Sequence, residues 1–375
     1  MNAINFTMSG QQLSALDCVG SWLKNDAKTN KIFRLFGYAG TGKTTIARHL
    51  ASGLNGRVVY AAFTGKAAMM MQRNGCEGAS TIHSLIYKFV QGPDGKFSFH
   101  LDPDSAAADA DLIVLDECSM VDVNLASDLM SFGTPILALG DPAQLPPVAG
   151  EGYFFTNAKP DAILTEIHRQ AKDSPVLQLA TDIREGKPLK YGAYGNSRVV
   201  PDGSLEIDEI LNADQLLAGR NVTRSHYNEE IRRALGRTSD LPEIGDRLVC
   251  QHNDHGLGIV NGGMFTVVSE PKKSRFSGTL SLELKSCDFP DHENYRVRVH
   301  PEFFTDDEER LADKERKNSQ QFKYGYALTV HKAQGSQWDH VIIEDESHIF
   351  DKYARNWLYT AVTRASECVT LVTRL

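Results

Sequence analysis

Residues 37–44 read Gly-Tyr-Ala-Gly-Thr-Gly-Lys-Thr and fit the spacing GxxxxGK(S/T). Glycines at this spacing let successive backbone N–H groups turn around an anion, and a helix behind them adds the positive end of its dipole. Lys43 can reach the outer phosphates of a nucleotide, and the Thr44 hydroxyl can be a ligand of Mg²⁺. The predicted nucleotide contacts here are Gly37, Gly40, Thr41, Gly42, Lys43, Thr44 and Thr45.

Two carboxylates, Asp116 and Glu117, follow the apolar run 111–115. A carboxylate at the tip of a buried strand can hold Mg²⁺ beside a phosphate loop, and the next one can orient or deprotonate the attacking water. Gln144 follows a further apolar run, and its amide can donate to a phosphate and accept from water. These residue types predict hydrolysis of a nucleoside triphosphate, with Asp116 and Thr44 at the metal and Lys43, Glu117 and Gln144 in catalysis.

Alternating strands and helices must position these groups. Apolar runs predict strands at 31–36, 57–63, 111–115 and 135–139, and helical patterns lie at 45–54 and 67–73. Such alternation is typical of a parallel sheet covered on both faces, whose ligands bind beyond the carboxyl ends of the strands. Every polar cluster named above falls at such an end.

Two segments interrupt this alternation. Residues 87–90 and 96–99 flank Gly-Pro-Asp-Gly at 92–95, which predicts a projecting β-hairpin. A second α/β region is expected after about residue 170, with apolar runs near 221–223, 341–344 and 369–373. Within it, residues 247–322 are richer in glycine and β-branched residues, which indicates a small β-rich insert. The acidic run 306–309 is expected to form a solvated face.

Composition limits the classes of protein. A chain of 375 residues predicts two or three domains, and 41% hydrophobic residues exclude collagen-like and disordered classes. Six scattered cysteines without a CxxC pair argue against a zinc ribbon and favour reduced thiols. The net charge of -8 argues against coating nucleic acid through bulk positive charge, but allows a local basic groove. No apolar run suggests a membrane span or signal peptide.

Nine motifs lie between residues 9 and 365. They follow one another in the order found in superfamily 1 helicases of the RecD/Dda-like branch (SF1B), which the chain therefore resembles. The compact organisation is similar to that of phage Dda-type helicases. The motifs are Ser9–Gln12, Gly37–Thr44, Thr64–Ala68, Thr81–His83, Asp116–Met120, Gly140–Pro147, Leu164–Gln170, Thr329–Gly335 and Tyr359–Ala365.

The resemblance implies two RecA-like domains, expected at 1–170 and 171–375. A pin-like hairpin insert is expected at about 86–108 and an SH3-like β insert at about 268–322. It also implies that Gln12 reads the adenine edge, and that Arg169 and Arg364 are arginine fingers that stabilise the transferring phosphoryl group. Taken alone, either arginine could equally form a surface salt bridge. Gly335 and Gln337 are expected near the nucleotide sugar, where relatives often carry glutamate in place of Gln337.

The resemblance further implies a track for a single nucleic-acid strand along both domains. Small hydroxyl and amide groups suit it, because they bind phosphates without reading sequence and release them easily. Thr81 and His83 could instead be ordinary residues at a helix start, and the hairpin aromatics could pack back on their own domain. The expected DNA-binding residues are Thr64, Lys66, Thr81, His83, Phe97, Phe99, Thr223, Arg224, Asn253, Asn261, Thr329, His331 and Lys332.

The expected function is that of an ATP- and Mg²⁺-dependent DNA helicase that moves along single-stranded DNA and unwinds tailed duplexes in replication, recombination or repair. Travel from 5′ to 3′ is implied by the branch. The alternatives are an RNA helicase and a DNA-stimulated ATPase that remodels protein on DNA; the paired arginines disfavour a small-molecule kinase. We expect a monomer in the cytoplasm of a bacterial or phage-infected cell, with a single-strand-binding, replication or recombination protein as partner.

Overall fold

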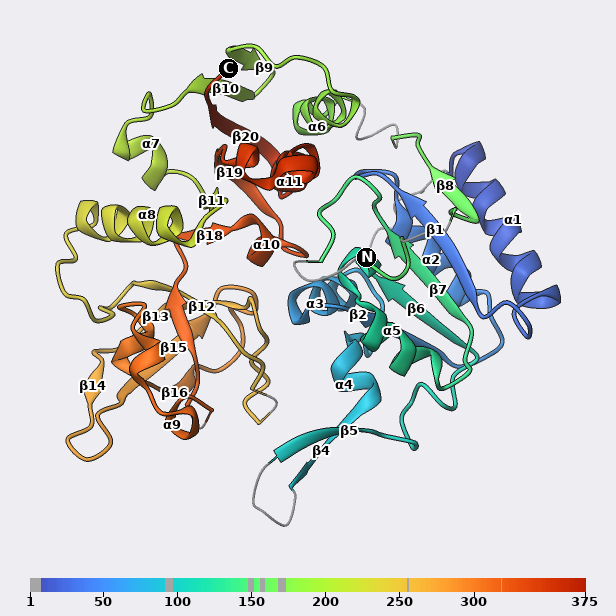
Figure 1. The fold of residues 1–375 in the computed structure, drawn as a ribbon, viewed down its shortest axis with the longest axis horizontal. Helices are drawn as coiled ribbons and strands as arrows, with labels where there is room; N and C mark the ends of the chain where they lie inside the picture. Colours follow the sequence, from blue (N-terminus) through green and yellow to red (C-terminus); the bar gives the residue numbers. More distant parts are fainter. Residues whose placement is uncertain are drawn as a thin grey trace. The chain divides into compact units, whose positions relative to one another are not determined.

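The computed structural model describes residues 8–91, 97–147, 152–155, 159–167, 173–254, 256–317 and 319–375. The chain forms two compact units, Met1–Gly186 and Lys187–Leu375, each built around sheets of its own (Figure 1). None of the helices within these ranges is both long enough and apolar enough to cross a membrane.

The first unit contains a six-stranded sheet in which every neighbouring pair is parallel. Four of its six strands match the predicted runs within one residue, because they are short apolar segments bounded by polar turns; the two edge strands were not predicted. In sheet order they are β3 (Ser80–Thr81), β2 (Val58–Ala62), β6 (Leu112–Asp116), β7 (Ile136–Gly140), β1 (Ile32–Gly37) and β8 (Ala162–Leu164).

Helices cover both faces of this sheet, and several helices of the unit begin at a capping side chain. Ser9 caps the first helix in a capping box with Gln12, and Ser174 caps the last one, which has Pro175 in its first turn. The helices are α1 (Gly10–Asn25), α2 (Lys43–Ser52), α3 (Gly65–Arg73), α4 (Ile82–Ile86), α5 (Val123–Met130) and α6 (Pro175–Glu185), with the short 3₁₀ helix η1 (Cys118–Met120).

The predicted hairpin is present between α4 and β6. Strands β4 (Tyr87–Gln91) and β5 (Phe97–Leu101) pair antiparallel with each other and with no other described strand, and they extend away from the sheet of the first unit (Figure 1). The predicted turn lies within residues 92–96, outside the described residues.

The second unit has a six-stranded sheet, parallel except for its edge strand β9. In sheet order the strands are β18 (Ala327–Thr329), β11 (Gln215–Ala218), β19 (Trp338–Glu344), β20 (Ala365–Thr373), β10 (Ser197–Pro201) and β9 (Gly192–Tyr194). The apolar run expected near 221–223 is instead the first turn of a helix, since the buried strand is the four-residue run that ends at Ala218. The helices are α7 (Ile207–Leu211), α8 (Asn221–Ala234), α10 (Val330–Ala333), α11 (Ala354–Val362) and η5 (Ser347–Tyr353).

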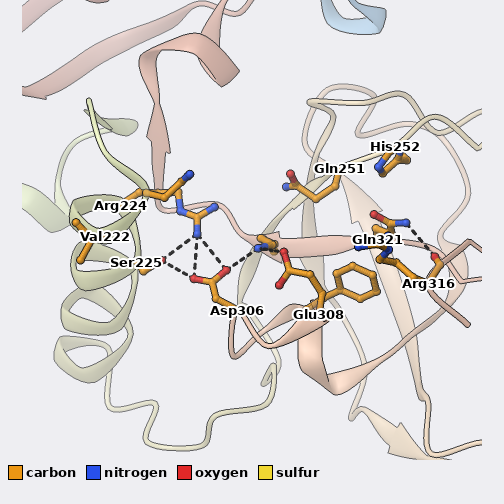
Figure 2. Close-up of a pocket in the computed structure, with 12 residues that line it drawn as sticks. Val222, Arg224, Ser225, Gln251, His252, Asp306, Glu308, Arg316 and Gln321 are labelled. Atoms are coloured by element: carbon orange, nitrogen blue, oxygen red, sulfur yellow. Dashed lines mark hydrogen bonds and ion pairs between the residues drawn. The ribbon is translucent and has the colours of Figure 1, made fainter. Parts of the chain in front are cut away.

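The β-rich region of the second unit is an antiparallel sheet with its own core. Its strands are β12 (Arg247–Cys250), β13 (Met264–Val267), β14 (Lys272–Lys273), β15 (Leu280–Ser286), β16 (Tyr295–Val299) and β17 (Phe322–Tyr324). Between β16 and β17 lie η3 (Pro301–Phe303), η4 (Glu308–Arg310) and α9 (Asp313–Lys317). The loop between η3 and η4 faces the first turns of α8, where Arg224 and Ser225 meet Asp306 (Figure 2).

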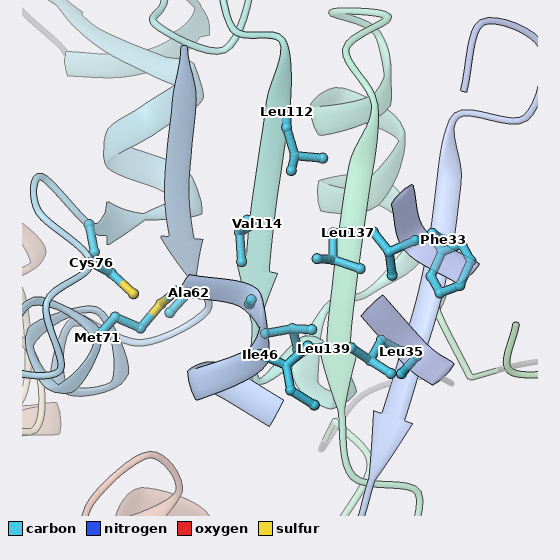
Figure 3. Close-up of a cluster of buried hydrophobic side chains, with 14 of the residues drawn as sticks. Phe33, Leu35, Ile46, Ala62, Met71, Cys76, Leu112, Val114, Leu137 and Leu139 are labelled. Atoms are coloured by element: carbon cyan, nitrogen blue, oxygen red, sulfur yellow. The ribbon is translucent and has the colours of Figure 1, made fainter. Parts of the chain in front are cut away.

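Alternation along the strands gives the first sheet two apolar faces. Leu35, Leu137 and Val114 point to the face covered by α1, α2 and α3, where Ile46 and Met71 pack against them (Figure 3). Neighbouring strand residues point to the opposite face, which α4 and α5 cover. Burial on both faces keeps the strands in register, so the positions of the strand ends are firmly determined.

Candidate functional site

The loop after β1 has the backbone that its glycines predict. Gly40 and Gly42 adopt φ values of 76° and 82°, and α2 begins directly behind them at Lys43. A Cβ atom on Gly40 would lie 2.6 Å from the Leu177 side chain, and one on Gly42 would lie 2.7 Å from the Gln12 amide nitrogen. The left-handed backbone favours glycine at both positions, while the two neighbours are the ends of flexible side chains.

Lys43 lies against this loop. Its Nζ donates to the carbonyl oxygens of Gly37 and Tyr38, at 2.7 and 3.2 Å. The buried Thr41 hydroxyl donates to the Tyr38 carbonyl at 2.8 Å, and Thr45 is half-buried in the first turn of α2. A cation and the open N-terminal end of a helix therefore lie together, as an anion site requires.

The predicted metal ligands are brought together from 72 positions apart in the sequence. The Thr44 hydroxyl donates to the Asp116 carboxylate at 2.9 Å, at the point where β6 ends. Glu117 follows with φ 52° and ψ 43°, an uncommon backbone for a non-glycine residue, and its N–H donates to the other Asp116 oxygen at 2.8 Å. A hydroxyl and a carboxylate oxygen form a donor set that suits Mg²⁺.

Gln12, in the first turn of α1, is buried, with 3% of its surface exposed, and it contacts the phosphate loop. Its Nε2 donates to the Thr41 carbonyl at 3.0 Å, and its Oε1 accepts from the Ser9 N–H at 2.9 Å. Both ends of the amide are thus already bonded, so contact with an adenine edge stays a prediction. In this structure the side chain ties the start of α1 to the loop.

The remaining predicted catalytic residues are distributed over both units. Gln144 is buried in the turn after β7, where its N–H donates to the Asp141 carbonyl at 3.1 Å. Arg169 lies outside the described residues. Arg364, at the end of α11 and 6% exposed, donates to the carbonyls of Thr360 and Ser336 and to the Thr363 hydroxyl.

The predicted track residues of the first unit surround the end of β2. Thr64 caps α3 through a bond from the Ala67 N–H to its hydroxyl at 3.1 Å, and Lys66 is buried in the first turn of that helix. Thr81 caps α4 in the same way, at 3.0 Å from the Ser84 nitrogen. Both threonines therefore have a structural role at a helix start, and any nucleic-acid role would be additional.

Three rings, those of His83, Tyr87 and Phe99, lie where α4 meets the hairpin. The His83 ring lies 5.6 Å from that of Tyr87. Desolvation by the surrounding residues lowers the His83 pKa, although the Asp122 charge opposes this. Phe99 is 59% exposed and contacts the Tyr87 ring edge-on at 6.2 Å. The side chain of Phe97 lies outside the described residues.

In the second unit, three predicted track residues form one chain of hydrogen bonds. Lys332 Nζ donates to Asn261 Oδ1 at 2.5 Å, and the Asn261 N–H donates to Asn253 Oδ1 at 2.7 Å. Thr329 caps α10, and His331 packs its ring 5.5 Å from Phe350. Burial lowers the pKa of Lys332 to about 8 and lowers that of His331. This chain connects α10 to the loop before β13.

Glu346, which no motif marked, organises the start of α8. Its carboxylate is 4% exposed and accepts from the Gly219 and Arg220 N–H groups, from Arg220 Nε and from the Thr223 hydroxyl at 2.7 Å. Burial alone would raise the Glu346 pKa, but these hydrogen bonds lower it overall. A buried, multiply bonded carboxylate of this kind leaves no sequence pattern, because its partners are 123 to 127 residues away.

The expectation for the acidic run 306–309 is wrong in one respect. Arg224 Nη2 donates to both Asp306 oxygens, at 3.1 and 3.0 Å, and Lys323 Nζ donates to Asp306 and Glu308 (Figure 2). The run thus contacts a predicted track residue directly and is no free solvated face. Gly335, with φ 78°, and the exposed Gln337 follow α10 in the same unit.

Comparisons with known protein families match both units. Residues 23–203 match the family described as AAA domain, and residues 324–372 match the UvrD-like helicase C-terminal domain. The ATP-dependent RecD2 DNA helicase of Deinococcus radiodurans is 31% identical over 96% of this chain, which spans 48% of that protein. The RecD subunit of the RecBCD enzyme of Mycolicibacterium smegmatis is 27% identical over 90% of this chain and 67% of its own length.

Solved structures share the fold at low identity. Bacteroides Pif1 bound to ssDNA is 17% identical, with 98% of this chain and 92% of that chain aligned and a TM-score of 0.60. Candida albicans Pif1 gives 17% identity, 99% and 95% coverage and a TM-score of 0.58. The predicted fold class, two RecA-like α/β domains, is confirmed. Motif order, sheet topology and relatives agree: the chain is similar in sequence to RecD helicases and shares its fold with Pif1 helicases.

Proposed function

We propose that this chain is an ATP-dependent DNA helicase that translocates along single-stranded DNA and unwinds duplex DNA. One observation carries the proposal: strand register brings the predicted metal ligand and the predicted track to the same strand end. Ala62, the last residue of β2, pairs with Asp116 on one side and with Thr81 on the other. A change at the nucleotide can therefore reach a track residue across a single strand.

The nucleotide roles follow from the contacts. Lys43 would exchange its two loop carbonyls for phosphate oxygens, and Mg²⁺ would be held by Thr44 and Asp116. When bound, the ion supplies charge neutralisation at the phosphates. Glu117 is assigned to orient or deprotonate the attacking water and Gln144 to the terminal phosphate.

Two arginines complete the proposed catalytic set. Arg169 and Arg364 are assigned to the charge that develops on the phosphoryl group. Arg364 would first have to release Thr360, Ser336 and Thr363.

The track and its inserts complete the proposal. The hydroxyl and amide side chains of both units would contact the strand, the β4–β5 hairpin would act as a pin at the junction, and the antiparallel sheet would clamp the strand. The named substrates of the relatives support DNA as the substrate, and the branch supports 5′→3′ travel. Replication or recombination proteins are proposed as partners.

Strand displacement on duplexes with only a 5′ or only a 3′ single-stranded tail tests this function. We expect ATP- and Mg²⁺-dependent displacement of the 5′-tailed duplex, and loss of displacement with Glu117→Gln. ATPase stimulation by single-stranded DNA without displacement would identify a translocase that does not unwind. Stronger stimulation by single-stranded RNA would identify an RNA helicase.

A further inference from the structure

A polar pocket of about 840 Å³ lies in the second unit, beside the start of α8. Three cations line it, Arg224 from α8, Arg316 from α9 and Lys323 from β17, and two carboxylates, Asp306 and Glu308, face them. The amides of Gln251 and Gln321 complete the polar lining (Figure 2). The described lining is therefore basic by one charge, and basic by three when the carboxylates are not counted.

Asp306 occupies this pocket in the way that a bound anion would. Its carboxylate accepts two bonds from Arg224 Nη2, one from the Ser225 hydroxyl at 2.6 Å and one from Lys323 Nζ at 2.6 Å. A guanidinium, a hydroxyl and an ammonium group around one anion are the donors that proteins use for a phosphodiester. Burial raises the Asp306 pKa, but the bonds from Lys323 and Ser225 and the Arg224 charge lower it overall, so the group is ionised near neutral pH.

The backbone conformation and the exposure of Asp306 both indicate that its carboxylate can be displaced from the pocket. Its φ is 54°, in the left-handed region, and its side chain remains 42% exposed. Such a backbone is less favourable for a residue with a side chain than for glycine. A partly exposed carboxylate held on strained backbone is easier to displace than a buried one.

Two buried atoms in the pocket lack partners. Arg224 Nε and Glu308 Oε2 make no hydrogen bond to any residue in the described part of the chain. Arg224 is only 14% exposed, so this donor is costly to leave unbonded unless another group meets it. The pocket therefore holds a donor that Asp306 does not satisfy.

The pocket also belongs to the region of the predicted track. It is lined by His252, which precedes Asn253, and the charges of Arg224 and Lys323 contribute to the lowered pKa of Lys332, after the larger effect of burial. Lys332 in turn bonds to Asn261, so the pocket cations lie in the same part of the second unit as two predicted track residues.

We propose that this pocket is a subsite for one phosphodiester group of single-stranded nucleic acid, and that Asp306, supported by Glu308, occupies it as an internal anion that the strand must displace. The proposal rests on the proposed function, because it specifies how the strand is held. Competition by a tethered carboxylate weakens each contact and lets the chain release the strand readily. The pocket favours a nucleic-acid strand over an acidic peptide because hydroxyl and amide groups surround its cations.

The test compares binding of fluorescein-labelled oligo(dT) to the full chain over a series of salt concentrations. Asp306→Asn keeps the size of the side chain, and asparagine tolerates left-handed backbone at least as well. We expect Asp306→Asn to bind about two- to five-fold more tightly at low salt, and Asp306→Asn with Glu308→Gln to bind more tightly still. The slope of log affinity against log salt should steepen by about 0.7 if one more phosphate is paired.

Glu309→Gln is the matched control. It removes the same charge from the neighbouring exposed position and has no contact with Arg224 or Lys323 among the described residues. Equal gains from Glu309→Gln and Asp306→Asn would overturn the proposal in favour of a general charge effect. In an Arg224→Ala background, Asp306→Asn should give a clearly smaller gain, because the freed guanidinium is missing.

The remaining outcomes separate this proposal from the proposed function. If the wild-type chain binds oligo(dT) and hydrolyses ATP but Asp306→Asn binds no more tightly, the internal anion is wrong while the helicase function stands. If Asp306→Asn instead gains affinity for a poly-glutamate peptide and not for oligo(dT), the pocket takes an acidic protein and the nucleic-acid subsite is wrong. If neither wild type nor Asp306→Asn binds oligo(dT), both proposals fail.

Discussion

The nucleotide site of the first unit and the pocket of the second both place an aspartate against a hydroxyl group, but they are built differently. Asp116 meets Thr44 at the end of a buried strand, and both belong to motifs. Asp306 meets Ser225 from a loop outside any sheet, and its other partners, Arg224 and Lys323, come from a helix and from a strand of the antiparallel sheet.

The nucleotide site and the pocket differ in what their cations contact in this structure. In the first unit the predicted metal ligands lie together, and Lys43 bonds to carbonyl oxygens of the loop. In the second unit the cations are assembled but an internal carboxylate neutralises them. The first arrangement favours tight binding of a small anion, and the second favours weak, repeated binding along a polymer.

Helix α8 makes the same contrast within one element. Its Arg232 binds Asp246, which is fully buried and also accepts from Arg237 and from the Tyr326 hydroxyl. Its Arg224, two turns earlier, binds the partly exposed Asp306. One pair fastens the helix to the antiparallel sheet, while the other lines an open pocket.

The largest effect is expected at the phosphate loop. Lys43→Ala should lower ATP turnover by about 10³-fold, because the transferring phosphoryl group loses its main protein cation. Binding of oligo(dT) should stay within about two-fold of wild type, since the track does not include this side chain. Turnover measured with saturating oligo(dT) checks this, and near-normal turnover would remove the nucleotide site from the first unit.

The structural pair should show its effect in stability. Asp246→Ala removes the nearest and fully buried counterion of Arg232, so we expect a loss of about 3 kcal/mol in the free energy of unfolding, measured by urea denaturation. Glu209→Ala breaks the exposed pair with Arg198 and should cost less than about 1 kcal/mol, as should Asp306→Asn. A loss with Asp306→Asn as large as with Asp246→Ala would erase the distinction between the two pairs.

The hairpin should affect unwinding alone. Phe99→Ala removes an exposed ring that could stack on a base pair, so we expect strand displacement to slow about tenfold while DNA-stimulated ATPase is kept. Leu101→Ala, in the same strand and also exposed, is the control and should leave displacement nearly unchanged. Full displacement by Phe99→Ala would mean that this ring plays no part in strand separation.

The smallest effect is a pH dependence of strand binding. Burial lowers the pKa of Lys332 to about 8; the Cys250 charge opposes this shift, while Arg224 and Lys323 add to it. Below that pH the amine is charged, so affinity for oligo(dT) should fall roughly three-fold between pH 7 and 9. Lys332→Arg should remove this dependence. The stability of the fold should change with pH in the opposite direction. Because the Lys332 pKa is lower in the folded state, the charged amine destabilises the fold, and this destabilisation disappears as the pH rises from about 8 toward 10.5.

The centre of the first unit could be predicted from the sequence: four of its six strands, two of its helices and the hairpin. Its strands are short apolar runs that end in polar residues, and its chemistry lies at those ends, so spacing along the chain reports distance in space. Gly40, Lys43, Thr44 and Asp116 all follow from this rule. The bond from Gln12 to the loop backbone was not predicted, whereas the alternative of Thr81 as a helix-start residue agrees with its bond to the Ser84 N–H.

The second unit could be predicted only in outline. Its class and its β-rich region followed from composition, but the position of β11 and the partners of Arg224 did not. Arg224 and Asp306 are 82 residues apart in the sequence. They pair because the antiparallel sheet packs beside α8, and no periodicity in the sequence predicts that packing. Glu346 shows the same limit, since its four donors come from a single short segment far from it in the chain.

The bond from Gln12 to the Thr41 carbonyl has a kinetic consequence. Because α1 already braces the loop, an arriving nucleotide does not need to order it, and association should proceed at the rate of electrostatic encounter. Gln12 would then influence how quickly the chain binds a new nucleotide. Gln12→Ala should lower the rate of nucleotide association more than it lowers the rate of nucleotide dissociation.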